Sequence, residues 1–366
     1  MQADVTRAQV PLAAYTTLGI GGPAATFLEP AEETGLTSAV RSADERGEPV
    51  LVLGGGSNVV IADEGFPGPV ARVATRGITM TGADGAVTMT VAAGEDWDAV
   101  VARCVGEGLA GLECLSGIPG LAGATPIQNV GAYGQEVADT ITAVRAYDRQ
   151  RREVAEIPAA ECGFAYRASA FKRAPFPGGG AAGRFVVLAV TFRLSRGPLS
   201  APIRYPELAT MLGVAPGERV PLGEARSAVL KLRARKGMVL DAGDPDSRSA
   251  GSFFTNPVLT SGEFAAVEER ARRACGPDAR VPRFPAAGGQ VKVPAAWLIE
   301  RAGFAKGYRP PGGASRISSK HTLALVNPGD ATAASLLALA REIRDGVRAT
   351  FGVSLVIEPV LVGLTL

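Results

Sequence analysis

The sequence of 366 residues contains almost no histidine and carries almost no net charge. Its one histidine, His321, excludes His-rich zinc and non-haem iron sites and leaves little room for a Ser-His-Asp triad. Lys+Arg 38 against Asp+Glu 36 leaves a formal charge of +2, so no overall field favours a nucleic acid or an acidic membrane. Any chemistry must therefore use other groups, and any anionic partner must be bound locally.

Paired cysteines, a secretory signal and long apolar runs are also missing. The four cysteines show no CxxC spacing, so we expect reduced, buried thiols rather than a metal or redox site. The amino-terminal residues lack the apolar core of a signal peptide, and the longest uncharged stretch, residues 114–135, is too rich in Gly, Pro, Gln and Asn to cross a bilayer. We therefore expect a cytoplasmic protein with no metal, membrane or nucleic-acid partner.

Glycine and apolar residues are abundant. Gly 46 and Pro 26 indicate many loops, and 46% hydrophobic residues are enough for a large core, which excludes disorder along the whole chain. The length suggests two or three domains. The pattern of short strands with scattered helices predicts a mixed, sheet-dominated architecture.

Local patterns predict individual elements. A stripe of apolar residues predicts a helix over residues 32–46, and PVLVLGGGSNVVIA reads as a strand, a glycine turn and a strand. A strand leading into a helix that ends at Gly108 follows, and further strands are predicted at 141–147 and 185–194.

The later part of the chain has a different character. A domain boundary is placed near Leu222, and helices are predicted over 294–302 and 330–351, the second of which stops at Gly352. The closing segment VSLVIEPVLVG is predicted to be a buried strand, although it contains Glu358. A carboxylate in such a strand requires a partner or a function.

Two glycine-rich loops could bind phosphate groups. GGGSN, residues 54–58, follows a strand and offers convergent backbone N–H groups, but it is neither a Walker loop nor a dinucleotide fingerprint. Alone it is more typical of a tight turn between strands. The uncharged stretch 115–137 can cradle a pyrophosphate and the edge of a planar ring, and an ordinary cover loop is the alternative. Two such loops in one domain favour a dinucleotide cofactor.

Several polar residues could line a site. Arg167, Ser252 and Glu358 each stand among apolar neighbours, which indicates either one shared polar pocket or three separate structural contacts. The basic residues Lys231, Arg233, Arg235 and Lys236 could capture a doubly anionic ligand, although a solvated face is the usual outcome. His321 is more typical of a structural residue than of a ligand contact.

Six motifs in one order carry a resemblance to a known family. LGGGSNVVIAD, LSGIPGLAGATPIQNVGAYGQEV, FAYRASAFK, AGSFFTNP, AAWLIERAG and SLVIEPVLVG together resemble the UDP-N-acetylenolpyruvoylglucosamine reductase (MurB) family, of the type with a tyrosine-bearing loop. The resemblance runs from about Tyr15 to Gly363. Several multi-residue motifs in the same order make chance similarity implausible.

The resemblance implies an α+β fold. It implies an FAD-binding domain of the p-cresol methylhydroxylase/vanillyl-alcohol oxidase type and a smaller α+β substrate-binding domain. The first would consist of a subdomain at 1–75, to which a C-terminal strand at 352–366 returns, and a subdomain at 76–222. The substrate-binding domain would cover residues 223–351.

The resemblance also implies cofactors and catalytic residues. FAD would be held by residues of both glycine loops, namely Gly54, Gly55, Gly56, Ser57, Asn58, Ile118, Pro119, Gly120, Gly123, Ala124, Thr125, Gln128, Asn129 and Gly131. A hydride would pass from NADPH to flavin N5 and then to C3 of the enolpyruvyl group, while Ser252 supplies a proton at C2. Arg167 and Glu358 would flank the substrate carboxylate.

The implied activity is reduction of UDP-N-acetylglucosamine enolpyruvate to UDP-N-acetylmuramate in peptidoglycan precursor synthesis. Substrate contacts would be Tyr166, Tyr205, Lys236, Asn256 and His321, where His321 departs from the glutamine that a relative can carry. Lys231 and Arg235 are interpreted as solvated. We expect a monomer, although the sequence does not determine the oligomeric state. A flavin oxidase on the same cofactor domain and a non-catalytic sugar-nucleotide-binding regulator are the alternatives.

Overall fold

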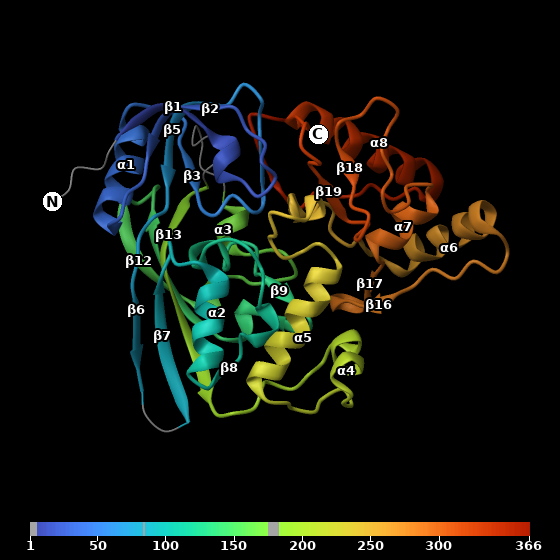
Figure 1. The fold of residues 1–366 in the computed structure, drawn as a ribbon, viewed down its shortest axis with the longest axis horizontal. Helices are drawn as coiled ribbons and strands as arrows, with labels where there is room; N and C mark the ends of the chain where they lie inside the picture. Colours follow the sequence, from blue (N-terminus) through green and yellow to red (C-terminus); the bar gives the residue numbers. More distant parts are fainter. Residues whose placement is uncertain (1–5, 83–84, 175–182) are drawn as a thin grey trace. The chain divides into compact units, whose positions relative to one another are not determined.

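The computed structural model describes residues 6–82, 85–174 and 183–366. The chain forms two compact units. Unit 1 contains residues 1–15, 22–56 and 64–239, and unit 2 contains residues 16–21, 57–63 and 240–366. The ribbon in Figure 1 shows the elements of each unit.

Unit 1 contains two main sheets. The first has the order β1-β2-β5-β3, with β1 (Arg7–Pro11), β2 (Pro23–Leu28), β3 (Leu51–Leu53) and β5 (Phe66–Arg72). The second has the order β12-β11-β13-β7-β6, and β8 also pairs with β13. Its strands are β6 (Ile78–Thr81), β7 (Ala86–Ala92), β8 (Leu109–Ala110), β11 (Ile141–Asp148), β12 (Glu153–Pro158) and β13 (Phe185–Arg196). All strand pairs of this second sheet are antiparallel, whereas β5 runs parallel to both β2 and β3.

Five helices and a small hairpin complete the described part of unit 1. The helices are α1 (Glu33–Glu45), α2 (Trp97–Gly106), α3 (Ala170–Arg173), α4 (Pro206–Leu212) and α5 (Leu222–Arg235), and β9 (Gly131–Ala132) and β10 (Gln135–Glu136) form the hairpin. Asp96 caps α2 by accepting a hydrogen bond from the Ala99 amide at 2.9 Å. Apolar side chains from both main sheets, α1 and α2 share one core, in which Trp97 is fully buried.

Unit 2 has short strands and three longer helices. The strands are β4 (Val59–Ile61), β14 (Ser249–Ser252), β15 (Val258–Leu259), β16 (Phe284–Pro285), β17 (Val291–Lys292), β18 (Arg316–Ile317), β19 (Ala324–Val326) and β20 (Val360–Val362), and the helices are α6 (Ser261–Cys275), α7 (Ala295–Arg301) and α8 (Ala333–Phe351). The sheets are β14-β19-β18, β15-β17-β16 and the parallel pair β20-β4. A capping box at Thr332 starts α8, and Gly352 ends it with φ 74°.

The predicted elements are confirmed with small shifts, with one exception. The helices predicted at 32–46, 294–302 and 330–351 are α1, α7 and α8. The prediction of one closing strand over VSLVIEPVLVG is wrong for most of its length, because only Val360–Val362 form β20. Pro359 has no amide hydrogen to continue a ladder, and Ile357 makes only an isolated bridge with Phe254. Glu358 therefore lies outside any strand.

The contact-based units divide the chain differently from the predicted domains. Residues 223–239, which include nearly all of α5, belong to unit 1, and the two predicted FAD-binding subdomains are both mainly part of this unit. The ranges 1–75, 76–222 and 223–351 stay predictions, since they rest on sequence resemblance rather than on contacts.

The predicted burial of the cysteines is confirmed for three of the four. Cys104, Cys114 and Cys162 are buried and Cys275 is partly buried, and none is in a disulfide. Burial raises the pKa of Cys104 and Cys114 to about 12 and that of Cys162 to about 11, so these thiols are protonated at neutral pH. In the described residues, no three His, Cys, Asp or Glu side chains are grouped to hold a metal ion. No helix in the same residues is long and apolar enough to cross a bilayer.

Candidate functional site

The two glycine loops meet inside unit 1. A β-carbon added to Gly55 would lie 2.7 Å from Cα of Gly120, which is closer than real β-carbons approach other atoms. Only glycine at position 55 therefore lets the two backbones approach so closely. Backbone N–H groups on two touching loops can donate to a pyrophosphate, so the residues present fit the adenine dinucleotide part of FAD. The sequence predicted both loops, and the fold brings them together.

The second loop is fixed on the start of α2 and the end of β7. Gly123 donates a hydrogen bond to the Ala93 carbonyl at 2.9 Å, and Ala122 donates to Glu95 O at 2.9 Å. A β-carbon on Gly123 would lie 2.5 Å from Cβ of Ala93, so glycine is required here as well. Thr125 donates to the Ala122 carbonyl at 2.8 Å. These contacts hold the segment in one conformation, as a preorganised cofactor site requires.

The end of this loop positions Arg167. Asn129 donates through Nδ2 to the Ala165 carbonyl at 3.1 Å, and Arg167 donates through Nη2 to the Gly131 carbonyl at 3.0 Å. Lys172 donates to both Oε1 of Gln128, at 2.8 Å, and the carbonyl of Arg167, at 3.1 Å. The side chains of Gln128 and Asn129 thus support the turn that carries Arg167, and any contact that they make with FAD stays a prediction.

Arg167 occupies a sharp turn. Ala165 and Ala168 exchange two backbone hydrogen bonds of 3.0 Å, which leaves Tyr166 and Arg167 at the corner. Arg167 has φ 53°, an unfavourable conformation for a residue with a side chain. Its guanidinium lies 5.7 Å from the ring centre of Tyr166, which is 39% exposed. Such strain is typical of functional positions, because the surrounding structure must stabilise it.

The predicted nucleotide contacts Tyr205 and Lys236 are brought together around a third residue. The Tyr133 ring packs edge-on against Tyr205 with centroids 5.4 Å apart, and Lys236 Nζ lies 5.7 Å from the centre of the same ring. Lys236 also forms an ion pair with Glu207 at 2.7 Å. Figure 1 shows α4 and α5, which carry these contacts, side by side. Neither Tyr133 nor Glu207 was identified from the sequence as a site residue.

Unit 2 brings Ser252 close to the segment that contains Glu358. Ser252 ends β14 and pairs in register with Ala324 of β19. The amide of Glu358 donates to the Phe253 carbonyl at 2.9 Å. Asn58 donates through Nδ2 to the Glu358 carbonyl at 3.4 Å and accepts from the Val360 amide at 2.9 Å. The last residue of GGGSN therefore supports the Glu358 segment, and Ser57 and Asn58 belong to unit 2 whereas Gly54 to Gly56 belong to unit 1.

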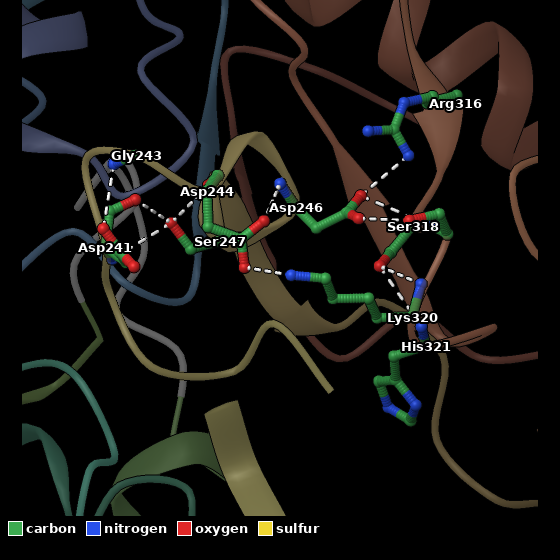
Figure 2. Close-up of polar contacts among 10 residues, drawn as sticks. Asp241, Gly243, Asp244, Asp246, Ser247, Arg316, Ser318, Lys320 and His321 are labelled. Carbon is green, nitrogen blue, oxygen red and sulfur yellow. Dashed lines mark hydrogen bonds and ion pairs between the residues drawn. The ribbon is translucent and has the colours of Figure 1, made fainter. Parts of the chain in front are cut away.

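Asn256 and His321 lie in different settings of unit 2. Asn256 accepts a hydrogen bond through Oδ1 from the Ala295 amide at 2.9 Å, so its oxygen caps the start of α7 and only its NH₂ group could donate to a phosphate. His321 donates from its backbone to Ser318 Oγ at 3.2 Å. Figure 2 shows its imidazole pointing away from the neighbouring carboxylates. A contact between His321 and the nucleotide diphosphate stays a prediction.

A buried carboxylate organises the turn next to His321. Asp246 is 3% exposed and accepts hydrogen bonds from Arg316 Nη1 at 2.7 Å and from the hydroxyl of Ser319 at 2.5 Å. Lys320 pairs with Asp244 at 2.7 Å, as Figure 2 shows. Burial raises the pKa of Asp246, but the hydrogen bonds from Ser319 and Arg316 outweigh it and hold that pKa below the usual range. These pairs fix residues 244–246 against 316–320.

The basic run on α5 separates into exposed and buried members. Lys231 and Arg235 are exposed, as interpreted from the sequence. Arg233 is buried, with 7% of its surface exposed, so the solvated face expected for the basic run does not include it. The apolar stripe Leu222, Ala225, Val229 and Leu232 could have revealed this, because Arg233 follows Val229 by one helical turn.

The fold and the loops define a class of protein. Residues 24–154 match the family described as "FAD binding domain", and residues 244–362 match "UDP-N-acetylenolpyruvoylglucosamine reductase, C-terminal domain". The chain is therefore an α+β flavoprotein with a cofactor domain and a second domain, which confirms the predicted fold class and FAD as cofactor.

Relatives identify the family. A UDP-N-acetylenolpyruvoylglucosamine reductase of Thermobifida fusca is 56% identical over 358 residues, covering 98% of both chains, and one of Saccharopolyspora erythraea is 56% identical over 356 residues, covering 97% of this chain and 95% of the relative. A crystal structure of the Thermus caldophilus reductase matches with a TM-score of 0.62 at 26% identity, covering 98% of each chain. The chain belongs to the UDP-N-acetylenolpyruvoylglucosamine reductase family, and its predicted class, an FAD-dependent oxidoreductase, is confirmed.

Proposed function

We propose that the chain reduces UDP-N-acetylglucosamine enolpyruvate to UDP-N-acetylmuramate in peptidoglycan precursor synthesis, with FAD as cofactor and NADPH as reductant. The observation that carries this proposal is the pair of touching glycine loops, one of which ends at the Gly131 carbonyl that Arg167 binds. One segment thus supports both the cofactor loop and a cation for an anionic substrate. Membership of the family selects this reaction among those that flavin domains perform.

FAD, held by the two glycine loops, would supply the redox chemistry, the transfer of a hydride from NADPH to C3 of the enolpyruvyl group. The chain has to bind the substrate and supply a proton. Arg167 binds the substrate carboxylate, and its strained turn holds the guanidinium in place. Positive charge there favours the enolate-like intermediate.

Ser252 donates the proton to C2. A serine of ordinary acidity is a poor donor, so the site must stabilise the charge that develops on its oxygen. Glu358 contributes through a hydrogen bond to the reacting group, and its backbone bond to Phe253 fixes it one residue from Ser252 along the chain. The Asn58 contacts hold the Glu358 segment from the other side.

Tyr205 and Lys236 bind the nucleotide diphosphate, with Tyr166, Asn256 and His321 as further substrate contacts. Tyr133 supports this role, because it packs against Tyr205 and lies under Lys236 Nζ. Action in the cytoplasm as a monomer is part of the same proposal.

The visible spectrum of the purified chain tests the proposal. A yellow flavin that NADPH bleaches, and that the enolpyruvyl nucleotide restores without oxygen, is the expected result. A protein that stays colourless after reconstitution with FAD would contradict it. So would a reduced flavin that only oxygen reoxidises, which is the behaviour of an oxidase.

A further inference from the structure

Glu113 is a buried carboxylate of unit 1 to which the proposed function gives no role. None of its surface is exposed, and it forms no ion pair in the described part of the chain. Its oxygens accept three hydrogen bonds instead, from the Gly111 amide at 2.7 Å, from Nε2 of Gln135 at 2.9 Å and from the Ala201 amide at 2.6 Å. Burying a carboxylate without a cation costs free energy, which these bonds have to offset.

Two of the three bonds join segments that are distant in the sequence. Gln135 lies 22 residues and Ala201 lies 88 residues beyond Glu113. Oε1 of Gln135 accepts a hydrogen bond from the Cys114 amide at 2.8 Å, so its NH₂ group is the end that faces Glu113. One buried side chain therefore ties the start of the second glycine loop to the β9–β10 hairpin and to the segment that leads to Tyr205.

The hairpin and this segment meet a second time at their aromatic residues. Tyr133 and Gly134 form the turn of the hairpin, with φ 49° and 83°. A β-carbon on Gly134 would lie 3.1 Å from Cβ of Arg204 and 3.4 Å from N of Tyr205. The rings of Tyr133 and Tyr205 are in edge-on contact. A tyrosine with positive φ is strained, so the surrounding structure must hold the turn in place.

Other backbone bonds of the segment lead away from the hairpin. The Ile203 amide donates to the Glu218 carbonyl at 2.8 Å, and the Gly217 amide donates to the Ile203 carbonyl at 2.7 Å. These bonds connect the segment to the chain that follows α4. The bond from Ala201 to Glu113 instead connects it to the hairpin and to the glycine loop.

We propose that Glu113 is a positioning residue for nucleotide binding, which sets the place of Tyr205 against the Tyr133 hairpin through its bond to the Ala201 amide. The inference rests on the proposed function, in which Tyr205 binds the nucleotide diphosphate, and extends it to a residue buried behind that contact. Glu113 acts through Tyr205, so it affects the affinity for the nucleotide and not the reduction of the flavin by NADPH.

Two variants of the same size as the wild type separate the bonds of Glu113. Glu113→Gln can keep its oxygen toward Gln135 and Ala201 and place its NH₂ group at the Gly111 amide. In the double variant Glu113→Gln/Gln135→Glu, the NH₂ group at position 113 must donate to the new carboxylate, so it replaces the oxygen that Ala201 binds. Each variant leaves one backbone amide without an acceptor, which matches their costs in stability.

Steady-state kinetics and anaerobic flavin reduction measure the effect. We expect the KM for the enolpyruvyl nucleotide to rise about tenfold in the double variant and less than about threefold in Glu113→Gln. The FAD content and the rate of flavin reduction by NADPH should match the wild type in both. In a Tyr205→Ala background the double substitution should raise KM no further, because the two changes act on one contact. Glu161→Gln, at an exposed position of unit 1, is the control for loss of a charge.

Other results overturn the inference. Equal KM values in the two variants, or a rise in KM that persists in the Tyr205→Ala background, would assign Glu113 to structure. Loss of FAD and of the thermal transition in both variants would do the same. A wild-type flavin that NADPH reduces but that the enolpyruvyl nucleotide does not reoxidise would remove the proposed function itself, which distinguishes the two failures.

Discussion

Lys236 and Glu207 form an ion pair between Nζ and Oε2 at 2.7 Å, which joins the end of α5 to the first turn of α4. Both side chains are about one-third or more exposed, so the pair contributes little to stability. Under the proposed function, a diphosphate that binds Lys236 would have to replace the carboxylate of Glu207. In that case the ion pair would compete with the nucleotide.

Glu207→Gln is expected to strengthen nucleotide binding. Removing the competing carboxylate should lower the KM for the enolpyruvyl substrate about two- to fivefold, in keeping with the free energy of an exposed ion pair, and leave kcat unchanged. Steady-state kinetics at low and high salt would measure this. Glu224→Gln removes an exposed carboxylate from α5 and serves as the control. An increase in KM for Glu207→Gln would show instead that the pair supports the site.

Gly55→Ala is expected to weaken FAD binding. The new methyl group would lie 2.7 Å from Cα of Gly120, and backbone cannot move aside as a flexible side chain can. Overpacking of this kind costs about 1–3 kcal/mol, so we expect about 5- to 150-fold weaker binding in a titration of the apoprotein with FAD. Gly106→Ala, at the end of α2 with open space around it, should bind FAD normally. Equal affinities for the two variants would show that FAD does not need the two loops in contact.

Ser252→Ala should separate the two half-reactions. NADPH should reduce the flavin at the wild-type rate, because no proton from Ser252 is needed in that step. Reoxidation by the enolpyruvyl substrate should slow about 10²- to 10⁴-fold, the contribution of a general acid. Anaerobic stopped-flow absorbance measures both steps. Ser354→Ala, an exposed serine of the same unit, is the control, and equal loss in both half-reactions would assign Ser252 to structure.

Asp246→Asn should destabilise unit 2 in a pH-dependent way. Removing one partner of a buried ion pair leaves Arg316 unpaired and costs about 3 kcal/mol. The folded-state pKa of Asp246 is lowered, so its stabilisation is complete above the unfolded pKa of about 4 and is lost as the pH falls through the folded value.

Urea unfolding of wild type and variant at a series of pH values would check the Asp246 prediction. The difference in stability should be largest near pH 7 and shrink below about pH 4. Asp345→Asn, which removes a partner of an exposed pair on α8, should show little difference at any pH. A constant difference down to pH 2 would mean that the charge of Asp246 is not what stabilises the turn.

Elements with local signals could be predicted from the sequence. α8 has an apolar stripe, a threonine cap and a terminal glycine within its own residues, so its extent was predicted to within a few positions. The glycine loops were equally visible, because glycine density reports a backbone requirement directly. The ordered motifs then supplied the identity that composition alone could not.

Features that depend on distant residues could not be predicted. The length of β20 is set by its pairing with β4, and Glu358 is held by Phe253 and Asn58, none of which is near it in sequence. The basic run could not be assigned to a helix or a strand, because charged residues alone do not distinguish the two. Arg233 is buried because it lies on the face of α5 that packs against the core. The number of charges in the run does not show which of them lie on that face.

The parallel pairing of Val59–Ile61 with Val360–Val362 also sets an order of events during synthesis. A ribosome releases β4 early, but its partner strand follows about 300 residues later, as the separation of Asn58 from Glu358 shows. Strand β4 therefore lacks its partner strand during most of synthesis, while most of unit 1 can already fold. Such a late closure of distant contacts is slow. The contacts of Asn58 with the Glu358 segment therefore form only after nearly the whole chain has emerged.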